Sequence, residues 1–371
     1  MRVALDVTPL LGARTGVGRF VEHLVPALAQ AGVELAPYVL SARGARGAPG
    51  AAPDLPAGTR QVRLPAAALV RAWGGLGRPR LRRVVAGPGA AVVHGTNFVA
   101  PPDPRPTVLT VHDCSFVTDP VSAVPVVRAF AAVVRRAVAQ GAWVHTPSRA
   151  VAEEAAALFG TDRVVAVPHG PPRLDPGDGR APTLTGGAPY VLAVGTLEPR
   201  KNLPRLVAAF GRVAPEHPDL HLVLAGPDGA DRPRVDAAVA ALPATLAARV
   251  HLPGWTDGPA RTELLRHAAV LAYPSLDEGF GLPLLEAMAV GTPVVAGRAG
   301  AIPEVAGDAA RLVAPTDVDE LAGALATVLA DRPLREQLVA AGRAQLRRFS
   351  WAATAEGLAT LYGRAAMERA R

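Results

Sequence analysis

Two carboxylates eight positions apart, Glu278 and Glu286, stand in the stretch YPSLDEGFGLPLLEAMAVG and are candidates to hold the hydroxyl groups of a sugar. Glycines between them allow close backbone approach to a ligand, and Pro283 favours a helix start here. Because a helix N-terminus presents unpaired N–H groups, an anion such as a diphosphate is favoured at this point. The simpler alternative is that the acids only cap a helix. The residues expected at the ligand are Gly279, Phe280, Gly281, Leu282 and Glu286.

The stretch GTLEPRKNL, residues 195–203, contains the only lysine of the chain, Lys201. Apart from the histidines, every other basic side chain is an arginine. Either this position requires a lysine or one lysine survived by chance. An ammonium is a compact point charge that can approach between two phosphates, where a planar guanidinium does not fit. We therefore expect Lys201, together with Arg200, Gly195 and Thr196, to hold a diphosphate.

Short apolar runs that end in Gly, His or Asp alternate along the chain with longer alanine-rich stretches of helical period. This alternation occurs twice and predicts two parallel sheets, each covered by helices on both faces. In the first half we expect strands at 2–7, 91–96, 107–113, 143–148 and 163–170, with helices at 16–32 and 148–160. In the second half we expect strands at 190–196, 220–226, 249–255, 269–275, 292–297 and 309–315.

A stretch rich in Pro and Gly, residues 170–189, has the composition of a linker between the two series. We place the boundary near residue 180, with one Rossmann-like doubly wound domain at 1–180 and a second at 181–348. The final helix, 349–371, is expected to pack back toward the N-terminal domain. In such α/β sheets ligands bind beyond the carboxyl ends of the strands. Since the polar residues fall at such ends, we expect the site in a central cleft between the domains.

The net charge of +7 belongs to the first half, where residues 1–180 hold 20 Arg against 12 acids. A solvated basic face and a surface for an anionic partner both fit this excess. A nucleic acid partner is not favoured, because no recognition motif accompanies the charge. Seven of the arginines follow one another without an intervening acid: Arg60, Arg63, Arg71, Arg78, Arg80, Arg82 and Arg83. They alternate with Leu64, Leu69, Val70, Trp73, Leu76 and Leu81.

Arginines mixed with apolar side chains suit an anionic membrane surface or the phosphate of a lipid-linked glycan. The Arg60–Arg83 segment is therefore a candidate membrane contact, and a plain solvated surface is the alternative. Cys114 is the only cysteine, which suits a reducing compartment, and we expect it to be a small buried filler. The chain shows no signal-peptide core and no apolar run of the ~18–20 residues that span a bilayer. We expect a cytoplasmic protein, with peripheral contact to the inner membrane face as an option.

The Glu278–Glu286 segment resembles the Glu-x7-Glu motif of the retaining glycosyltransferases of family 4. VGTLEPRKN resembles the same family's phosphate-binding turn, GARTGVGRF its N-terminal glycine loop, and TVLTVHD its histidine-bearing strand end. The resemblance runs in order over essentially the whole chain. It implies a GT-B fold, with the donor nucleotide on the C-terminal Rossmann-like domain and the acceptor mostly on the N-terminal one.

The resemblance also implies that His112 faces the donor sugar and the reaction centre; a structural histidine at a strand end is the alternative. Gly16 and Gly18 precede a helix and could bring backbone amides to the phosphates, or form only a tight turn. Many family members carry Arg directly after the first glycine of the phosphate turn, where this chain has Thr196. Arg200 and Lys201 are then expected to act without it. The candidates for the acceptor are His94, Asn97 and Asp113.

An Asp-x-Asp pair at Asp317 and Asp319 matches the metal signature of other glycosyltransferases only superficially. It stands where acids suit the start of a helix. No cluster of His, Cys and Glu with metal-ligand spacing occurs elsewhere in the sequence. We therefore expect a metal-independent enzyme without a cofactor.

Together these residues and the family resemblance imply retaining transfer of a mannose- or glucose-type hexose from a UDP- or GDP-sugar to a hydroxyl of a glycan, a lipid-linked sugar or a small molecule. The expected catalytic residues are His112, Arg200, Lys201 and Glu278. Preorganised cations would stabilise the charge that develops on the leaving diphosphate. The alternatives are a GT-B nucleotide-sugar epimerase or sugar phosphorylase, and a non-catalytic nucleotide-sugar-binding partner of another enzyme.

Overall fold

Two parallel sheets organise the chain in the computed structural model, which describes residues 1–11, 16–42, 55–81, 85, 89–118 and 125–368. The contacts within the chain divide it into two compact units. Unit 1 comprises Met1–Gly170 and Phe349–Arg371, and unit 2 comprises Pro171–Arg348. The predicted α/β fold with two Rossmann-like domains is confirmed. Among the described residues, no helix is long and apolar enough to cross a bilayer.

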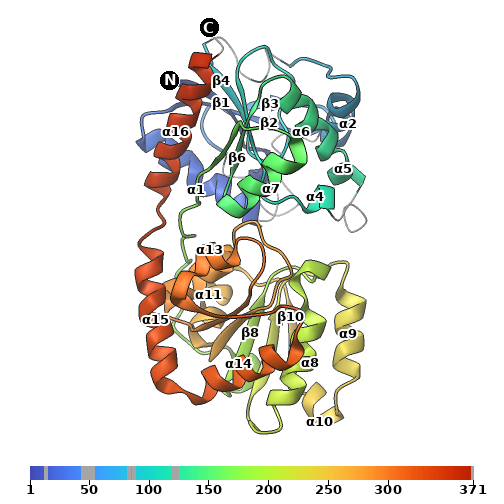
Figure 1. Ribbon diagram of the computed structural model, residues 1–371, viewed down its shortest axis with the longest axis vertical. Helices are drawn as coiled ribbons and strands as arrows, with labels where there is room; N and C mark the ends of the chain where they lie inside the picture. Colours follow the sequence, from blue (N-terminus) through green and yellow to red (C-terminus); the bar gives the residue numbers. More distant parts are fainter. Residues whose placement is uncertain (12–15, 43–54, 82–84, 86–88, 119–124, 369–371) are drawn as a thin grey trace. The chain divides into compact units, whose positions relative to one another are not determined.

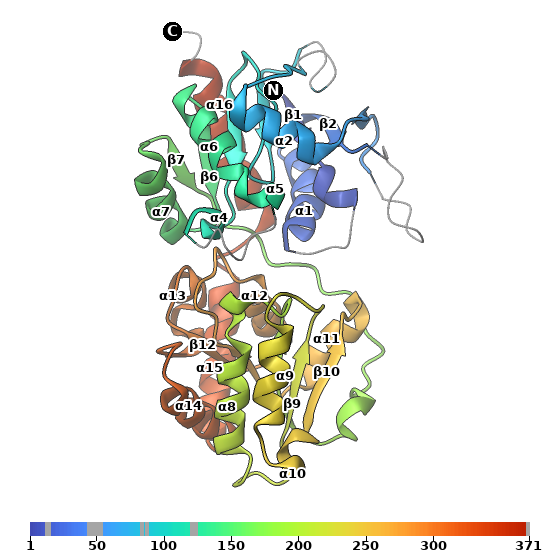
Figure 2. The same ribbon diagram turned by 90° about the vertical axis from the view of Figure 1, so that its right-hand side faces the viewer.

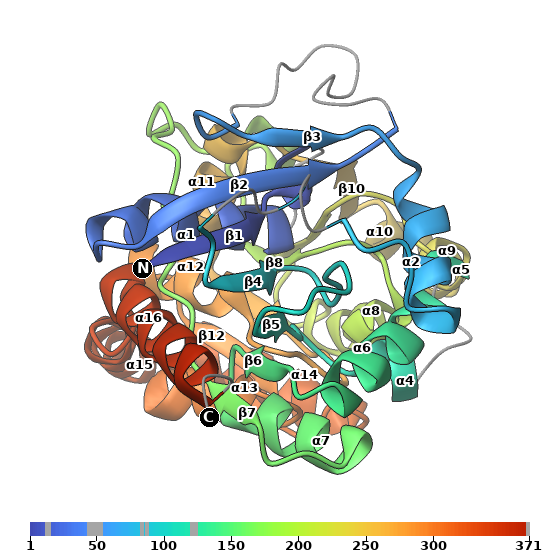
Figure 3. The ribbon, with the colours of Figure 1, turned by 90° about the horizontal axis from the view of Figure 1, so that it is seen from above.

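Unit 1 contains seven parallel strands in the order β3-β2-β1-β4-β5-β6-β7 (Figure 3). Their bounds are β1 Arg2–Asp6, β2 Glu34–Leu40, β3 Arg60–Val62, β4 Val92–Gly95, β5 Thr107–Thr110, β6 Trp143–Thr146 and β7 Val164–Ala166. From β1 the chain adds strands on one side up to β3, and then on the other side from β4 to β7. The point between β1 and β4 is therefore the topological switch point, and sheets of this kind bind ligands beside it.

Helices cover both faces of the unit 1 sheet because successive strand residues point to opposite faces. Val3 and Leu5 of β1 pack with α1 (Gly16–Gln30) and α16 (Trp351–Glu368), which lie side by side (Figure 1). Ala4, between them in sequence, belongs to the core of the other face. The helices on that face are α2 Ala66–Gly75, α6 Phe130–Ala139 and α7 Arg149–Phe159. Short helices α4 (Ser115–Thr118) and α5 (Pro125–Arg128) precede α6.

Unit 2 repeats the plan with six parallel strands in the order β10-β9-β8-β11-β12-β13. Their bounds are β8 Tyr190–Val194, β9 His221–Ala225, β10 Val250–Gly254, β11 Val270–Tyr273, β12 Val294–Gly297 and β13 Ala310–Val313. The switch point lies between β8 and β11. The helices, several visible in Figure 2, are α8 Leu203–Val213, α9 Arg232–Ala240, α10 Ala244–Ala247, α11 Gly258–His267, α12 Leu282–Val290, α13 Ile302–Ala306, α14 Val318–Ala330 and α15 Arg332–Leu346.

The division between the units falls at Gly170, ten residues before the boundary expected from composition. The reason is that the Pro- and Gly-rich stretch is held by α11 of unit 2. The N–H of Gly179 donates to Glu263 Oε1 at 3.3 Å, and a Cβ on Gly177 would lie only 1.9 Å from the same oxygen. At the other end of the chain, α16 packs on α1, and Thr354 Oγ1 donates to Pro168 O at 2.7 Å.

Most of the apolar side chains of the Arg60–Arg83 segment are buried, so among the described residues they form no continuous exposed apolar face. Four of them belong to the core between the sheet and α2: Leu69, Val70, Trp73 and Leu81. Among the apolar side chains of this segment that were expected at a membrane, only Leu64 and Leu76 are exposed in the described residues. Arg82 and Arg83 lie outside the described residues. In the described part of the segment Arg63, Arg71, Arg78 and Arg80 are exposed while most of the apolar side chains are buried, so the interleaved pattern reflects packing against unit 1.

A chain of hydrogen bonds through two buried histidines ties α16 to the unit 1 sheet. Tyr362 Oη lies 2.7 Å from His94 Nδ1, and His94 Nε2 lies 2.8 Å from Thr110 Oγ1. Thr110 Oγ1 lies 2.9 Å from His145 Nδ1, and His145 Nε2 lies 3.0 Å from the carbonyl oxygen of Val167. The chain crosses β4, β5 and β6 and ends at the residue that follows β7.

The protonation of this chain follows from its last contact. A carbonyl only accepts, so His145 Nε2 donates to Val167 O, and Nδ1 of the neutral ring accepts from Thr110. The Thr110 oxygen then accepts from His94 Nε2–H, and His94 Nδ1 accepts from Tyr362. Each group has one role, and a proton added to either ring removes an acceptor. Hence the hydrogen bond from Tyr362 of the C-terminal helix to His94 forms only while His94 is neutral.

This network predicts that unit 1 loses stability in mild acid. Burial lowers the pKa of His145 to about 4, outweighing the hydrogen bond to Val167. Because the unfolded chain takes up the proton first, the contribution of neutral His145 is fully present above pH ~6.5 and is lost as the pH falls toward ~4. The loss amounts to about 3 kcal/mol in the free energy of unfolding.

A His145→Gln variant isolates this effect, because its amide can accept from Thr110 and donate to Val167 without titrating. The comparison is needed since burial raises the pKa of Asp6 to about 6, which adds stability over the same fall in pH. Urea unfolding at several pH values should show the wild type losing its advantage over the variant below pH ~6.5. A constant difference between the two proteins would contradict the assignment.

Candidate active site

The loop after β11 and the helix that follows it place both glutamates of the sequence motif in the interior of unit 2. The apolar run of β11 ends at Tyr273, and α12 begins at Leu282. Gly281 closes the loop with φ +96°, a left-handed conformation that favours glycine over other residues. Pro283 occupies the first turn of α12, as expected. Glu278 in the loop and Glu286 on the helix are both buried.

The turn after β8 brings the lysine to the same edge of the sheet. Gly195 has φ +148°, and a Cβ there would lie 3.2 Å from Lys201 Cε. Asn202 has φ +59°, and its Nδ2 donates to the carbonyl oxygens of Pro274 and Pro315 at 3.0 and 2.6 Å. The N–H of Leu276 donates to Arg200 O at 2.8 Å. The loops after β8 and β11, on the two sides of the switch point, are therefore fastened to each other.

Glu278 is the centre of the resulting cluster. Its Oε1 accepts from Lys201 Nζ at 2.5 Å and from Ser275 Oγ at 2.7 Å. Its Oε2 accepts from Arg200 Nη1 at 2.7 Å. Lys201 Nζ also donates to the Tyr273 hydroxyl at 3.2 Å and lies 4.9 Å from the centre of that ring. Both oxygens of the carboxylate are engaged by fixed donors.

The cluster holds charge in a place where burial opposes it. Burial alone would raise the pKa of Glu278, but Lys201, Arg200 and the hydrogen bond from Ser275 outweigh it and lower this pKa to about 2. Burial lowers the pKa of Lys201, and Glu278 opposes that change. Arg200 also pairs through Nε with Glu198 Oε2 at 3.0 Å. Lys201 and Arg200 thus lie beside the N-terminus of α12, where the unpaired N–H groups of a helix favour binding of an anion.

Glu286 has a partner that the sequence did not reveal. Its side chain is 1% exposed, and Arg261 of α11 donates to Oε2 through both Nε, at 2.9 Å, and Nη2. An arginine fork of this kind neutralises a carboxylate in a fixed orientation. In the stretch TDGPARTELL, residues 256–265, Arg261 has the pattern of an ordinary exposed helix residue. No local sequence signal therefore indicated its pairing with Glu286. Trp255, which follows β10 directly and precedes α11, is 61% exposed and offers a flat apolar face at the same edge of the sheet.

The expected site residues of unit 1 are described separately, since they belong to another compact unit. His112 is half-buried, its Nε2 donates to Thr96 O at 2.8 Å, and it meets the edges of Phe20 and Phe98. Burial lowers the pKa of His112, and its contacts to Thr96 and Asp113 oppose that change. The ring is therefore fixed in orientation.

The remaining unit 1 candidates have mixed outcomes. Gly16 and Gly18 lie in the first turn of α1, and residues 12–15 before them are outside the described residues. Asp113 accepts from the N–H and hydroxyl of Ser115, so it caps the short helix α4. Asn97 is half-buried at the end of β4. Nothing in unit 1 tests Gly16, Gly18 or Asn97 as ligand contacts.

His94 was expected at the acceptor, and the structure assigns it a different role. Its side chain is fully buried, and both ring nitrogens are engaged by Tyr362 and Thr110. A histidine held in this way has no edge left for a ligand. Cys114 is fully buried, which agrees with its interpretation as a small filler.

The acids at 317–319 start a helix, as their position suggested. Asp317 accepts from the N–H groups of Asp319 and Glu320 and so caps α14. Asp319 pairs with Arg212 of α8. Within the described parts of the chain, no group of three or more His, Cys, Asp or Glu side chains could hold a metal ion.

Comparison with known families accounts for both units. Residues 14–171 match the family model described as glycosyltransferase family 4, and residues 179–345 match the model described as glycosyl transferases group 1. The chain is 36% identical over 163 residues to the O-antigen chain mannosyltransferase B of Escherichia coli, covering 44% of this chain and 42% of that protein. It is 34% identical over 281 residues to the D-inositol 3-phosphate glycosyltransferase of Mycobacterium avium, covering 66% and 65% of the two chains.

Solved structures agree with the fold. The sucrose-phosphate synthase of Thermosynechococcus elongatus superposes with a TM-score of 0.74 over 98% of both chains, at 24% identity. A glycosyltransferase involved in lipopolysaccharide biosynthesis superposes with a TM-score of 0.71, at 16% identity, over 97% of this chain and 98% of its own. At these identities the likeness shows the fold alone. The sequence matches above span less than two thirds of those relatives' own length.

The pairing of Arg261 with Glu286 predicts a measurable coupling energy. Arg261→Gln leaves the carboxylate of Glu286 buried without that cation, and removing one member of a buried pair costs about 3 kcal/mol in the free energy of unfolding. Adding Glu286→Gln to the Arg261→Gln variant should recover part of this loss, as a double-mutant cycle by urea unfolding would show. Arg332→Gln, which breaks an exposed pair with Glu336, is the control and should change little. Additive single effects at the first pair would contradict the assignment.

Proposed function

Since this chain belongs to glycosyltransferase family 4, we propose that it is a retaining hexosyltransferase. It moves a mannose- or glucose-type hexose from a UDP- or GDP-sugar to an acceptor hydroxyl. The observation that carries the proposal is the cluster of buried Glu278 and Lys201 with half-buried Arg200 at the switch point of unit 2. Cations held at the carboxyl ends of the strands, beside a helix N-terminus, can bind the diphosphate of such a donor.

The cluster supports the chemistry of the leaving group. When the anomeric bond breaks, negative charge grows on the diphosphate, and preorganised cations stabilise that charge without reorganising. Lys201 and Arg200 already occupy fixed positions through Glu278, Tyr273 and Glu198. The amides of Gly279, Phe280, Gly281 and Leu282 complete the phosphate site. Glu278, facing the hexose, orients both cations and accepts sugar hydroxyl bonds.

Glu286 and Trp255 suit the nucleoside end of the donor. The Glu286 carboxylate, fixed by Arg261, can accept two hydroxyl hydrogen bonds from a ribose. The exposed indole of Trp255 offers a stacking face for a base at the carboxyl end of β10. The supported donor is therefore a nucleoside diphosphate sugar.

The state of Glu278 favours a same-face mechanism. Both of its oxygens are engaged, and its pKa is lowered to about 2, so it is a poor proton carrier and a hindered nucleophile. In the proposed reaction the acceptor oxygen bonds to the anomeric carbon on the face from which the diphosphate departs. The departing phosphate oxygen takes the acceptor's proton. His112, with its ring held by Thr96, is proposed to contact the donor sugar.

The acceptor belongs to glycan, glycolipid or natural-product assembly in this proposal. The relatives named as mannosyltransferases support a mannosyl donor over other hexoses. We propose a cytoplasmic location and activity without a metal. A nucleotide-sugar epimerase would turn over donor without acceptor, a sugar phosphorylase would require inorganic phosphate, and a silent binding partner would form no product. Product analysis with the isolated chain distinguishes these alternatives.

Lys201→Met tests the leaving-group role, because it removes Nζ and keeps the apolar stem. We expect kcat to fall by about 100- to 1,000-fold, since the lost charge acts mainly in the transition state. Lys201→Arg should also be impaired, because a planar guanidinium does not replace a compact ammonium. The donor is first chosen by a thermal-shift screen of nucleotide sugars, as a ligand of the folded state raises its melting temperature. A fully active Lys201→Met variant that unfolds like the wild type would refute the role.

Activity should persist in excess EDTA. Lys201, Arg200 and the N-terminus of α12 already supply positive potential, and Asp317 is committed to capping α14. Initial rates with and without the chelator, after passage through a desalting column, make the comparison. Inactivation that magnesium or manganese reverses would show a metal requirement and contradict this part of the proposal.

A further inference from the structure

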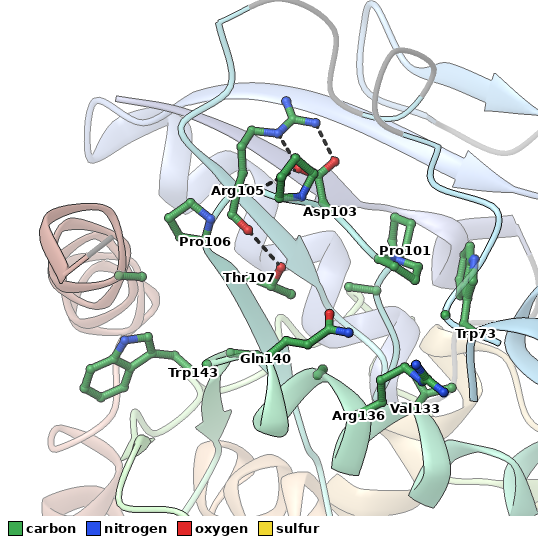
Figure 4. Close-up of a pocket in the computed structure, with 18 of the residues that line it drawn as sticks. Trp73, Pro101, Asp103, Arg105, Pro106, Thr107, Val133, Arg136, Gln140 and Trp143 are labelled. Atoms are coloured by element: carbon green, nitrogen blue, oxygen red, sulfur yellow. Dashed lines mark hydrogen bonds and ion pairs between the residues drawn. The ribbon is translucent and has the colours of Figure 1, made fainter. Parts of the chain in front are cut away.

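A cavity of about 620 Å³ opens in unit 1 at the edge of the sheet opposite to His112 (Figure 4). Thr107, the first residue of β5, and Trp143, the first residue of β6, line it. His112 follows the other end of β5. Since all strands of this sheet are parallel, the cavity lies at the amino ends of the strands, and ligands of the proposed transfer are expected at the carboxyl ends.

Several separate stretches of the chain build the walls of this cavity, among them residues 73–80, from which Trp73, Gly77 and Arg80 line it, and Arg163 before β7. The connection from β4 to β5 contributes four prolines, which restrict the backbone and preform the wall: Pro101, Pro102, Pro104 and Pro106. Helix α6 contributes Arg136, and Gln140, which caps the C-terminus of α6, extends across the opening (Figure 4). The last turns of α16 contribute Ala365 and Glu368. A volume in this range is typical of small-molecule sites.

The lining is positively charged. Four arginines, Arg80, Arg105, Arg136 and Arg163, face two acids, Asp103 and Glu368. Asp103 is already committed, because Arg105 donates to both of its oxygens, Nε to Oδ1 and Nη2 to Oδ2, each at 2.7 Å. Its side chain is 1% exposed, so it presents little negative charge to a ligand.

Two of the arginines are held in place by contacts that leave donors available. Arg163 Nη1 donates to Gly141 O at 3.1 Å and pairs with Glu368 Oε2 at 3.0 Å, and its guanidinium lies 5.8 Å from the Trp143 ring centre. These contacts leave Nε and Nη2 of Arg163 without a partner among the described residues. Arg136 donates to Gly74 O and Gly75 O at the end of α2. Arg80 forms no ion pair with any residue that the structure describes.

We propose that this cavity binds a phosphate group, at a site separate from the nucleotide-sugar site of unit 2. Guanidinium groups match the geometry of phosphate oxygens and bind them through paired hydrogen bonds. Arg105, Arg136 and Arg163 are already held by their contacts around a roomy cavity with a rigid wall, so such a site needs little reorganisation to bind phosphate. The proposal does not depend on the transfer reaction, because none of these residues belongs to the unit 2 cluster.

The phosphate can come from a soluble phosphorylated molecule or from a lipid headgroup. Leu76, 79% exposed, directly precedes Gly77, which lines the cavity. Met367, 66% exposed, directly precedes Glu368 on the opposite wall. These exposed apolar side chains, each next in sequence to a lining residue, are compatible with acyl chains beside a headgroup, so both sources are tested.

The test measures binding of inorganic phosphate by isothermal titration calorimetry at constant ionic strength. Arg80→Gln with Arg163→Gln should weaken this binding at least about tenfold, because each lost charge-assisted hydrogen bond has a cost of this order. Arg343→Gln with Arg347→Gln, an equal change of charge on exposed arginines of unit 2, is the matched control and should bind like the wild type. Lys201→Met identifies any phosphate bound at the unit 2 site. Of the variants tested, only this one should lose that part of the binding.

Vesicles distinguish the two sources. Retention on mixed phosphatidylglycerol and phosphatidylcholine vesicles, but not on phosphatidylcholine alone, would assign the site to a lipid headgroup if the Arg80 and Arg163 variant loses it. Phosphate binding without vesicle retention would assign it to a soluble ligand. Wild-type affinity for phosphate in the Arg80→Gln, Arg163→Gln variant would overturn the proposal. So would a Lys201→Met variant that binds no phosphate at all, since all binding would then belong to unit 2. Arg80→Gln alone repeats the test if the double variant does not fold.

Discussion

The burial of one ammonium beside one carboxylate governs how the unit 2 site is built. A lysine and a glutamate out of water are stable only when they are paired and hydrogen-bonded. The pairing of Lys201 with Glu278 meets that condition, and it requires the loops after β8 and β11 to lie against each other. Asn202 secures the same two loops through the carbonyl oxygen of Pro274. The cations are thereby in place before a ligand arrives, as the proposed stabilisation of a departing diphosphate requires.

Unit 1 obeys a related constraint with neutral groups. His94 and His145 are buried without a charged partner, so each must remain neutral and fill both of its hydrogen-bonding positions. Tyr362 of the C-terminal helix supplies the donor that completes the chain. This hydrogen bond adds to the packing of α16 on α1, which makes the C-terminal helix part of unit 1 although it follows unit 2 in sequence.

The sequence allowed the two sheets and the core of the unit 2 site to be predicted, because strand periodicity and strand-end residues are local signals. Lys201 and Glu278 stood in loops between well-defined elements, so their convergence at a switch point followed from topology. Arg261 was missed because its partner, Glu286, lies on another helix, and sequence spacing does not encode that contact. His94 and Trp73 were misjudged for the opposite reason: polar or amphipathic side chains beside a suggestive motif were buried by packing that local composition does not reveal.

The single lysine makes the central claim directly measurable. Protein labelled with [13Cε]lysine gives one side-chain resonance, whose chemical shift reports the charge and surroundings of Lys201. The account predicts an ammonium at neutral pH and a saturable shift of this resonance on addition of the nucleoside diphosphate that corresponds to the donor. In the Glu278→Gln variant the Lys201 resonance should lie at a different position before the nucleoside diphosphate is added, since the partner of the ammonium has changed. A resonance that stays fixed while the nucleoside diphosphate raises the melting temperature would show that the phosphates bind elsewhere.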